Sequence, residues 1–420
     1  MAPAYPPGLP LHMAVLAGIF GWGIGPFLVS PLAALSVLFL MYSLARRMGL
    51  SPIMSFAGAC IIAAFPVFLF IAVQPMSDVL AAAWVILVVF AALRSRKRES
   101  WALLAGAGFG MSVLVRPSNI LVLFALAAAL PFKLKAYLKF FLGGCLFGAV
   151  QLGFNQNLYG NPFVSGYLTE VVNALALPNL PRLIPFIGRW LSRMLTPLVL
   201  FSWFAVMADR KVPLRDRLVL FLWFAPFLIF YGLYQPLENW TFIRFFLPAL
   251  PAVILSALFV LRDGTSYALQ KTHSADRIGT GKKRTRAQLI KIAAVALVIL
   301  VVFVEIGEVK KLRLLDVDEY ESVYKKSCLA VKEALPENSV VIAGQLSGAL
   351  TYYTHVLPCL WDSLQPSSFS VLQFKASQRG FGIYALLFPH EESEFQKYAP
   401  GAWEKITNYE FVSLWKFKEQ

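Results

Sequence analysis

Four charged residues in this 420-residue chain have the types and spacing that chemistry at a phosphate would need. Asp78 follows a Pro-Met-Ser turn, Arg116 opens an Arg-Pro-Ser-Asn turn, and Glu238 and Arg244 flank Trp240. A carboxylate can take the proton from a hydroxyl, and a guanidinium can hold a phosphate through two parallel hydrogen bonds. These residue types could therefore serve proton transfer and the binding of an anionic group.

Each of these residues also has a purely structural interpretation. Asp78 can cap the start of a helix or pair with a cation, and an arginine at a helix end can reach lipid headgroups. Glu238 and Arg244 can close their loop as a salt bridge. In the functional interpretation Arg244 contacts an anionic group, Trp240 offers a ring on which a ligand can stack, and Asn119 of the Arg-Pro-Ser-Asn turn adds an amide. Both interpretations stay open on the sequence alone.

The four charged residues lie near the ends of hydrophobic segments, which must position them. Ten apolar stretches approach or reach the ~17–25 residues that a bilayer span requires. They cover about 27–46, 53–73, 77–93, 101–116, 118–132, 138–157, 190–208, 217–234, 243–261 and 289–306. The stretches 101–116 and 118–132 are short, and a proline turn between two short helices would leave a polar notch in the membrane.

The positive charge predicts which ends of these segments face outward. The basic clusters at 46–47, 94–98, 133–139, 210–217 and 262–291 fall at alternate gaps between spans, so those gaps are expected to be cytoplasmic. The gaps near 1–10, 74–78, 116–119, 155–189 and 235–244 then lie outside. Before the C-terminal domain the outward acids are Asp78, Glu170 and Glu238, and the outward cations are Arg116, Arg182, Arg189, Arg193 and Arg244.

Composition agrees with a polytopic membrane protein. Hydrophobic residues make up 58% of the chain and aromatic residues 14%, and the mean hydropathy is +0.65. A soluble core could not bury so many apolar side chains. The net charge of +15 follows from the inner loops, helped by anionic inner-leaflet lipid, so no nucleic-acid partner is expected.

The N-terminal segment, 1–26, is expected to lie at the outer surface or in the interface. Its apolar part, from 9 to 22, contains His12 and leads into a Gly- and Pro-containing turn, which favours an interfacial or re-entrant helix over a span. An interfacial hydrogen bond is a more common role for such a histidine than that of a base. Residues 27–306 are predicted to form the transmembrane helical domain.

Residues 307–420 are predicted to form a soluble outer domain. The segment 339–344, Ser-Val-Val-Ile-Ala-Gly, is typical of a buried strand with a turn after it, and 345–355 can be a helix packed on that strand. This pattern predicts a small α/β domain. Cys328 and Cys359 lie in it and could form a disulfide in an oxidising compartment or remain two buried thiols.

Several strings, in this order, resemble the polytopic C-type (GT-C) membrane glycosyltransferases. They are Tyr-Pro-Pro-Gly-Leu-Pro-Leu at 5–11, Tyr-Ser-Leu-Ala-Arg-Arg at 42–47, Gln-Pro-Met-Ser-Asp at 74–78, Arg-Pro-Ser-Asn at 116–119 and Arg-Phe-Phe-Leu-Pro-Ala-Leu-Pro at 244–251. The group resembled includes protein O-mannosyltransferases and the lipid A aminoarabinose transferase-like enzymes. The resemblance covers the membrane part and implies a mainly α, polytopic helical bundle of about ten spans with a small C-terminal α/β domain on the outer face.

The resemblance also implies an activity and its partners. Such an enzyme transfers a sugar, with inversion, from a polyprenyl-phosphate-linked donor to an envelope glycan, lipid or protein. It does so at the outer, periplasmic face of the bacterial inner membrane, among membrane lipids. No cofactor and no metal are expected. The predicted catalytic residues are Asp78 and Glu238, and the predicted substrate-binding residues are Arg116, Arg244, Asn119, Trp240, Tyr5 and His12.

The chain departs from the pattern of that family at its beginning. Family members open with a further helix and an outer loop that carries an acidic catalytic residue, upstream of the segment that here begins at Tyr5. Nothing acidic precedes Asp78 in this sequence. The expectation is therefore that the sequence begins downstream of the true start, or that the base of a divergent member lies elsewhere.

Two other classes of protein remain as alternatives. A transporter for a lipid or small solute would use helix breaks, which Pro66, Pro197 and Pro226 could supply, but ionisable residues are nearly absent from the span centres. A membrane scaffold that binds a glycan or lipid without catalysis would explain why no acid precedes Asp78.

Overall fold

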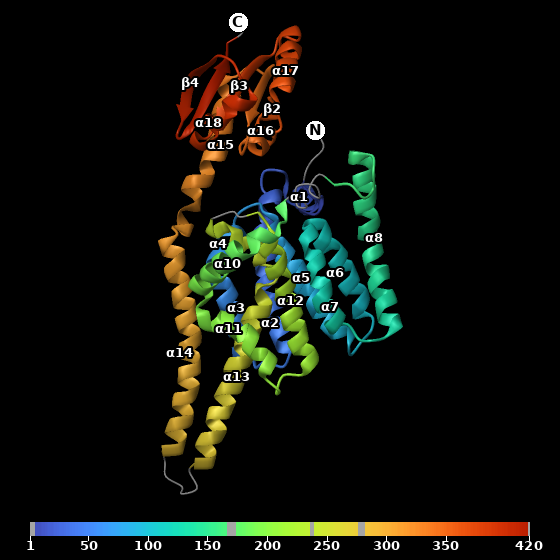
Figure 1. Cartoon of the computed structure of the whole chain (residues 1–420), viewed down its shortest axis with the longest axis vertical. Coiled ribbons are helices and arrows are strands. Elements are labelled where there is room, and N and C mark those ends of the chain that lie inside the picture. The colour runs from blue at the N-terminus through green and yellow to red at the C-terminus, as the bar shows by residue number, and fades with distance from the viewer. Residues whose placement is uncertain (1–4, 166–173, 236–238, 276–281, 419–420) are drawn as a thin grey trace. The chain divides into compact units, whose positions relative to one another are not determined.

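The computed structural model describes residues 5–165, 174–235, 239–275 and 282–418. It divides into two compact units, Met1–Leu314 and Leu315–Gln420, which are considered separately. The first unit is helical, and the second contains a sheet covered by helices (Figure 1). This is the predicted fold class, a mainly α membrane bundle followed by a small α/β domain.

The first half of the helical unit runs from the N-terminal segment to a long helix at one side of the bundle. Its elements are α1 (Gly8–Phe20), α2 (Gly25–Arg47), α3 (Pro52–Ala64), α4 (Pro66–Ala72), α5 (Ser77–Ser95), α6 (Trp101–Val115), the 3-10 helix η1 (Pro117–Val122), α7 (Leu123–Ala129) and α8 (Leu134–Tyr159). The helix α5 is enclosed on most sides, whereas α8 stands beside α6 with most of its surface exposed (Figure 1).

The second half completes the bundle and ends in two long neighbouring helices. Its elements are η2 (Leu177–Asn179), α10 (Leu180–Leu195), α11 (Pro197–Ala208), α12 (Leu214–Leu233), η3 (Trp240–Phe246), α13 (Leu250–Ala275), α14 (Lys282–Lys311) and η4 (Leu314–Asp316). In Figure 1, α13 and α14 lie side by side. The helix α14 continues past residue 306, where the sequence places the end of the membrane domain, and the division between units falls after Leu314.

Six helices in the described residues are long and apolar enough to cross a membrane, and eight spans result if each of two bent pairs counts as one. The six are α2, α5, α8, α12, α13 and α14, and three shorter apolar helices cover Gly8–Phe20, Trp101–Val115 and Pro117–Ala129. The chain is therefore an integral, multi-pass membrane protein. The sequence predicts about ten spans because the two short stretches, 101–116 and 118–132, are each counted as a span. The stretch 190–208 is also counted there as one span.

Prolines explain where the apolar stretches break. Phe65, Arg116 and Thr196 each precede a proline and each leave the helical region of backbone space. The ring of a proline excludes the helical conformation from the residue before it, so a new helix begins at the proline. The chain bends by 68° at Phe65 and by 108° at Thr196. The stretch 190–208 is accordingly two helices rather than one span.

The C-terminal unit is a five-stranded mixed sheet with helices on both faces. The strands β1 (Ser339–Ala343), β2 (Leu357–Leu360), β3 (Gly382–Leu387), β4 (Trp403–Tyr409) and β5 (Val412–Phe417) lie in the order β2-β1-β3-β5-β4. The β1 strand pairs in parallel with β2 and β3, and β5 is antiparallel to β3 and β4. The helices are α15 (Val317–Ala334), α16 (Ser347–Tyr353), α17 (Pro366–Gln378) and α18 (Pro389–Tyr398).

Successive side chains of the buried strand β1 point to opposite faces of the sheet, so the core of this unit has two parts. Val341 and Ala343 join one apolar cluster with residues of α15 and α16, while Ile342 joins the other with residues of α17 and α18. Cys328 is buried in the first cluster, and both Cys328 and Cys359 are free thiols. Of the two alternatives for these cysteines, the structure contains the separate thiols.

Candidate active site

Asp78 and Arg116 form a buried ion pair at one end of the helical bundle. Asp78 lies in the first turn of α5, and Arg116 lies at the break between α6 and η1, where Pro117 keeps its backbone extended. The Nη1 of Arg116 donates a hydrogen bond to Oδ1 of Asp78, and the two residues are only 6% and 4% exposed. Their opposite charges offset the cost of burial in a setting with little water.

The aromatic ring of Phe245, in η3, lies beneath two guanidinium groups. The Cζ atom of Arg116 is 4.5 Å from the ring centre, and that of Arg244 is 5.1 Å from it. Tyr231 of α12 stacks on the same ring at 5.1 Å and donates a hydrogen bond of 2.8 Å to Ser118 in η1. Cation–π contacts and stacking thus join α12, η1 and η3 around both arginines.

Arg244 faces the beginning of α5. Its Nη1 lies 3.6 Å from the sulfur of Met76, the residue directly before α5. Thioether sulfur is a weak acceptor, and Arg244 has no carboxylate partner within the described residues. No side chain caps the start of α5, whose first N–H groups and dipole favour an anion. A half-buried guanidinium and an uncapped helix start therefore meet beside the Asp78–Arg116 pair.

Buried amides flank this arrangement. The Nδ2 of Asn119 donates a hydrogen bond of 2.9 Å to the carbonyl of Ser112, while its Oδ1 has no partner among the described residues. Gln74, in the turn that leads into α5, is buried, and its Nε2 likewise has no partner there. Buried polar groups are seldom left unpaired, so these two positions favour a bound ligand close to the ion pair.

Trp240 and Glu238 belong to the segment that precedes Arg244. Trp240 begins η3 and packs edge-on against Phe70 of α4, with 5.1 Å between ring centres. Asn239 caps the same 3-10 helix by accepting a hydrogen bond from the N–H of Thr241. Glu238, which the sequence predicts as a second catalytic carboxylate, lies outside the described residues.

His12 and Tyr5 lie on or before α1. The His12 ring is bonded at both nitrogens, with Nδ1 2.7 Å from the carbonyl of Gly8 and Nε2 accepting from the indole N–H of Trp84 at 3.1 Å. The second of these contacts ties α1 to α5. Tyr5 is 76% exposed and precedes the helix. The structure brings neither residue into contact with the Asp78–Arg116 pair.

A large apolar cavity lies along α5, and Asp78, Arg116 and Arg244 are not among the residues that line it. It has a volume of about 860 Å³, and its walls come mainly from α1, α2 and α5. On α5 the lining starts at Leu80, two residues after Asp78, and continues to Leu87. Its few polar groups include His12, whose nitrogens are already bonded. The size and apolar walls of this cavity suit a hydrocarbon chain.

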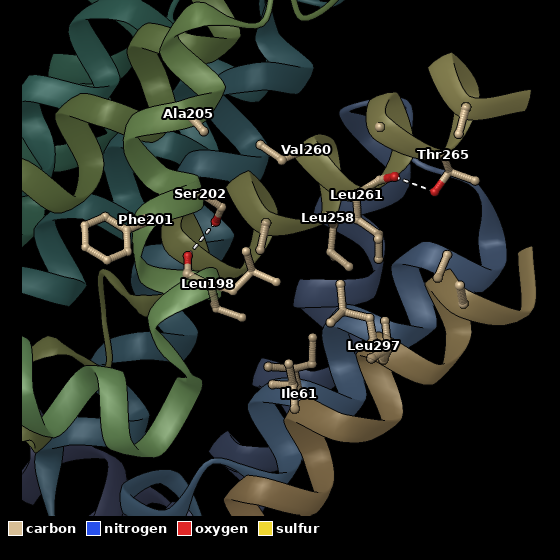
Figure 2. Close-up of a pocket in the computed structure, with 18 of the residues that line it drawn as sticks. Ile61, Leu198, Phe201, Ser202, Ala205, Leu258, Val260, Leu261, Thr265 and Leu297 are labelled. Carbon is tan, nitrogen blue, oxygen red and sulfur yellow. Dashed lines mark hydrogen bonds between the residues drawn. The ribbon is translucent and has the colours of Figure 1, made fainter. Parts of the chain in front are cut away.

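A second apolar cavity, of about 560 Å³, lies between α11, α13 and α14 (Figure 2). Ser202 and Thr265 are among its polar residues, and each hydroxyl donates to a carbonyl one turn earlier in its own helix. The remaining labelled walls, such as Phe201, Leu261 and Leu297, are hydrocarbon. This cavity offers no group for acid–base chemistry or phosphate binding.

The other arginines that the sequence predicts to face outward differ from Arg244 in their surroundings. Arg193 of α10 pairs with the buried carboxylate of Glu308 on α14, and Lys311 reaches the same carboxylate at 2.8 Å. Arg182 and Arg189 are exposed on α10.

In the described residues no group of three or more His, Cys, Asp or Glu side chains is placed to hold a metal ion.

Sequence reasoning selected the charged residues of this arrangement but not its supporting side chains. Phe245, Tyr231 and Gln74 are the residues it missed. The Arg-Phe-Phe string contains Phe245, but an aromatic residue beside an arginine usually belongs to the core, so the sequence carries no specific signal for its role. A glutamine next to a proline at a helix start is an equally weak signal.

Comparison with known proteins gives the fold independently. No protein-family model matches the sequence, and no curated protein sequence is significantly similar to it. Two solved structures of ArnT from Cupriavidus metallidurans are similar over nearly the whole chain. The one bound to undecaprenyl phosphate has a TM-score of 0.65 and 12% identity, and the alignment covers 98% of this chain and 88% of ArnT. The apo structure has a TM-score of 0.59 and 14% identity, with coverage of 99% and 88%.

These similarities define the class of fold. The chain has a GT-C fold like that of ArnT, as the resemblance in the sequence predicts. Its similarity to ArnT extends through the C-terminal α/β unit, because the alignments leave almost none of the chain uncovered.

Proposed function

We propose that this chain transfers a sugar from a polyprenyl-phosphate-linked donor to an envelope glycan, lipid or protein at the outer face of a bacterial inner membrane. The observation that supports this most is the GT-C fold over 98% of the chain. One of the two similar ArnT structures is bound to undecaprenyl phosphate, which is a polyprenyl phosphate. The charged site at the start of α5 supports the same chemistry.

The donor phosphate binds, in this proposal, between Arg244 and the start of α5. Arg244 has only the sulfur of Met76 as a described hydrogen-bond partner, so its donors can turn to a phosphate. The uncapped N–H groups of α5 add a second source of positive potential. The polyprenyl chain occupies, in the same proposal, the cavity of about 860 Å³ along α5, whose walls are almost entirely hydrocarbon.

The transfer step exchanges one bond to the anomeric carbon of the sugar for another. The acceptor oxygen attacks that carbon, the bond to the phosphate oxygen breaks, and the polyprenyl phosphate leaves with the bonding electrons. The proton of the acceptor hydroxyl passes to a carboxylate. Arg244 and Arg116 stabilise the negative charge that develops on the leaving phosphate.

Asp78 is the carboxylate that we assign to this step. In the structure it is bonded to Arg116. A donor phosphate that contacts Arg116 competes with Asp78 for the guanidinium, and the carboxylate is then released to accept the proton. Glu238 remains a second proposed carboxylate. Trp240, Asn119, Tyr5 and His12 are proposed to act in substrate binding, the last two as part of the segment that borders the apolar cavity.

Transfer in proteoliposomes tests this function. The purified chain is reconstituted with a total lipid extract of bacterial envelopes, and mass spectrometry follows the loss of polyprenyl-phosphate sugar and the release of polyprenyl phosphate. Asp78→Asn should lower the rate at least about 100-fold, because a base is lost. Asp216→Asn is the matched control, since Asp216 is also ion-paired, with Arg96, but belongs to the predicted cytoplasmic end.

Each result distinguishes between the candidate functions. Loss of donor with the wild-type chain and with Asp216→Asn, but not with Asp78→Asn, supports the proposal. Near-normal turnover by a folded Asp78→Asn variant contradicts the assignment of Asp78. A wild-type chain that binds polyprenyl-phosphate sugar without consuming it would instead be a glycan- or lipid-binding scaffold.

A further inference from the structure

The C-terminal unit has a small cavity of mixed character beneath α18. Its volume is about 380 Å³, and it lies between α18 and the strands β4 and β5. The lining includes two tryptophans, Trp403 and Trp415, together with the polar side chains of Glu392, Ser393 and Gln396. This combination of flat aromatic surface with a few polar groups differs from the two almost wholly apolar cavities described above.

The tryptophans are held in place by the protein and present only ring surface to a ligand. The indole N–H of Trp403 donates to the carbonyl of Ala399 at 3.0 Å, and that of Trp415 donates to Ser413 at 2.7 Å. Trp403 also packs edge-on against Phe395 with 4.9 Å between ring centres. Because both N–H groups are used, the rings can offer a ligand apolar contact and C–H stacking but no hydrogen bond.

The polar groups lie on one face of α18. Glu392 and Gln396 are four residues apart and therefore neighbours on the helix surface. One oxygen of Glu392 accepts a hydrogen bond from Ser413, which fixes the carboxylate while its side chain stays 34% exposed. Gln396 and Ser393 are exposed. The face thus presents a carboxylate, an amide and a hydroxyl beside the tryptophan rings.

A pyranose sugar has the matching chemistry. Its ring carries one surface of C–H groups, which packs on an indole, and a rim of hydroxyls, which donate to carboxylate and amide oxygens. The carboxylate of Glu392 disfavours an anionic sugar, and Lys405 lies 3.9 Å from it and 5.4 Å from the centre of the Trp415 ring. A neutral sugar adds no charge to the cavity, so the Glu392 carboxylate and the Lys405 ammonium continue to balance each other.

We propose that the cavity between α18, β4 and β5 binds a neutral pyranose unit of a glycan. The site belongs to the C-terminal unit alone and does not depend on the transfer site in the helical unit. It would let the chain hold a glycan independently of the donor phosphate.

Saturation-transfer NMR on the full chain in detergent micelles tests this site. The probes are the methyl pyranosides of glucose, galactose, mannose and N-acetylglucosamine, with methyl glucuronide as the anionic comparison. The variants are Glu392→Gln, which keeps an oxygen for Ser413 to donate to, and Gln396→Ala on the exposed face. Glu394→Gln is the matched control, because Glu394 is an exposed carboxylate on the same helix and does not line the cavity.

The expected result is saturation transfer to at least one neutral pyranoside, with affinity lowered about 5- to 10-fold in Gln396→Ala and in Glu392→Gln, as loss of one ligand hydrogen bond predicts. Glu394→Gln should bind like the wild-type chain. Binding that persists in Arg244→Ala separates this site from the donor site. The inference is overturned if no neutral pyranoside binds, if only the glucuronide binds, if Glu392→Gln and Gln396→Ala bind like the wild type, or if Arg244→Ala abolishes the signal.

Discussion

At the scale of single residues, the Asp78–Arg116 pair determines how the site is interpreted. A carboxylate and a guanidinium that are both almost fully buried stabilise each other, and neither is stable there alone. Arg244 is the contrasting case, because its neighbours in the described structure are an aromatic ring and a thioether. The first arginine is held in place by a protein carboxylate, while the second is available for an external anion.

Removing one partner of the buried pair should be more costly than removing both. Arg116→Ala leaves the Asp78 carboxylate buried and unpaired, so we expect a loss of about 3–5 kcal/mol in the free energy of unfolding. The double variant Asp78→Asn, Arg116→Gln should lose less than Arg116→Ala. Thermal unfolding in detergent measures both.

The exposed pair Lys133–Glu99 provides the control for that comparison. Its lysine side chain is 66% exposed, and surface pairs contribute at most about 1 kcal/mol. Lys133→Ala should therefore change stability little. Equal losses for Arg116→Ala and Lys133→Ala would contradict a structural role for the buried pair.

The two thiols of the C-terminal unit should differ in reactivity. Burial raises the pKa of Cys328 to about 12, and it also raises that of Cys359, which is only half-buried. The reactive form is the thiolate, so at pH 8–9 iodoacetamide should label Cys359 slowly and Cys328 hardly at all until the unit unfolds. Peptide mass spectrometry at each pH gives the extent of labelling.

The raised pKa of Cys328 also fixes the direction of a pH effect on stability. The ordinary pKa of 9.0 applies to the unfolded chain, so below pH 9 the thiol is protonated in both states. Between pH 9 and about 12 the unfolded chain loses this proton first, and the contribution of Cys328 to stability falls. A Cys328→Ala variant should show a smaller loss over this range. Rapid labelling of Cys328 in the folded chain at pH 8 would contradict its burial.

At the scale of elements, prolines and glycines determine how the helices meet. The sequence allows a helix break at three prolines. Pro66 and Pro197 begin new helices after sharp bends, whereas Pro226 stays inside α12 without ending it. A proline marks a possible break, but whether the chain bends there depends on the packing around it. The bend at Thr196, which separates α10 from α11, could not be predicted from hydropathy alone.

Close packing of α6 on α8 depends on Gly106. A methyl group at this position would overlap the carbonyl of Phe140, so Gly106→Ala should push the two helices apart and cost about 1–3 kcal/mol. The control is Gly148→Ala on α8, where nothing lies near the added carbon. That change should be neutral or slightly stabilising because alanine favours the helix.

Thermal unfolding of detergent-solubilised protein compares these two glycine variants. A Gly106→Ala variant as stable as Gly148→Ala would show that α6 and α8 do not approach each other in the way described.

At the scale of the whole molecule, hydropathy and charge predicted the class of fold. Alternating basic gaps and apolar stretches identified the membrane bundle, and the strand at 339–343 identified the α/β domain. The site was predicted less completely. Asp78 and Arg116 are far apart in sequence, and whether Asp78 caps α5 or pairs with an arginine depends on how α5 packs against α6 and η1. No local pattern contains that information.

Affinity for undecaprenyl phosphate is the measurement that tests the proposed site most directly. The wild-type chain and the variants Arg244→Ala, Arg116→Ala and Arg182→Ala are each titrated with the lipid in detergent and analysed by native mass spectrometry. Arg182 is an exposed arginine on α10 that is also predicted to face outward, and it serves as the matched control.

We predict that the wild-type chain and Arg182→Ala bind the lipid similarly and that Arg244→Ala binds at least about tenfold more weakly, because a charged hydrogen bond to phosphate is lost. Arg116→Ala should also bind more weakly than Arg182→Ala. Equal affinities in all four proteins, or no binding by the wild-type chain, would contradict a donor-phosphate site at the start of α5.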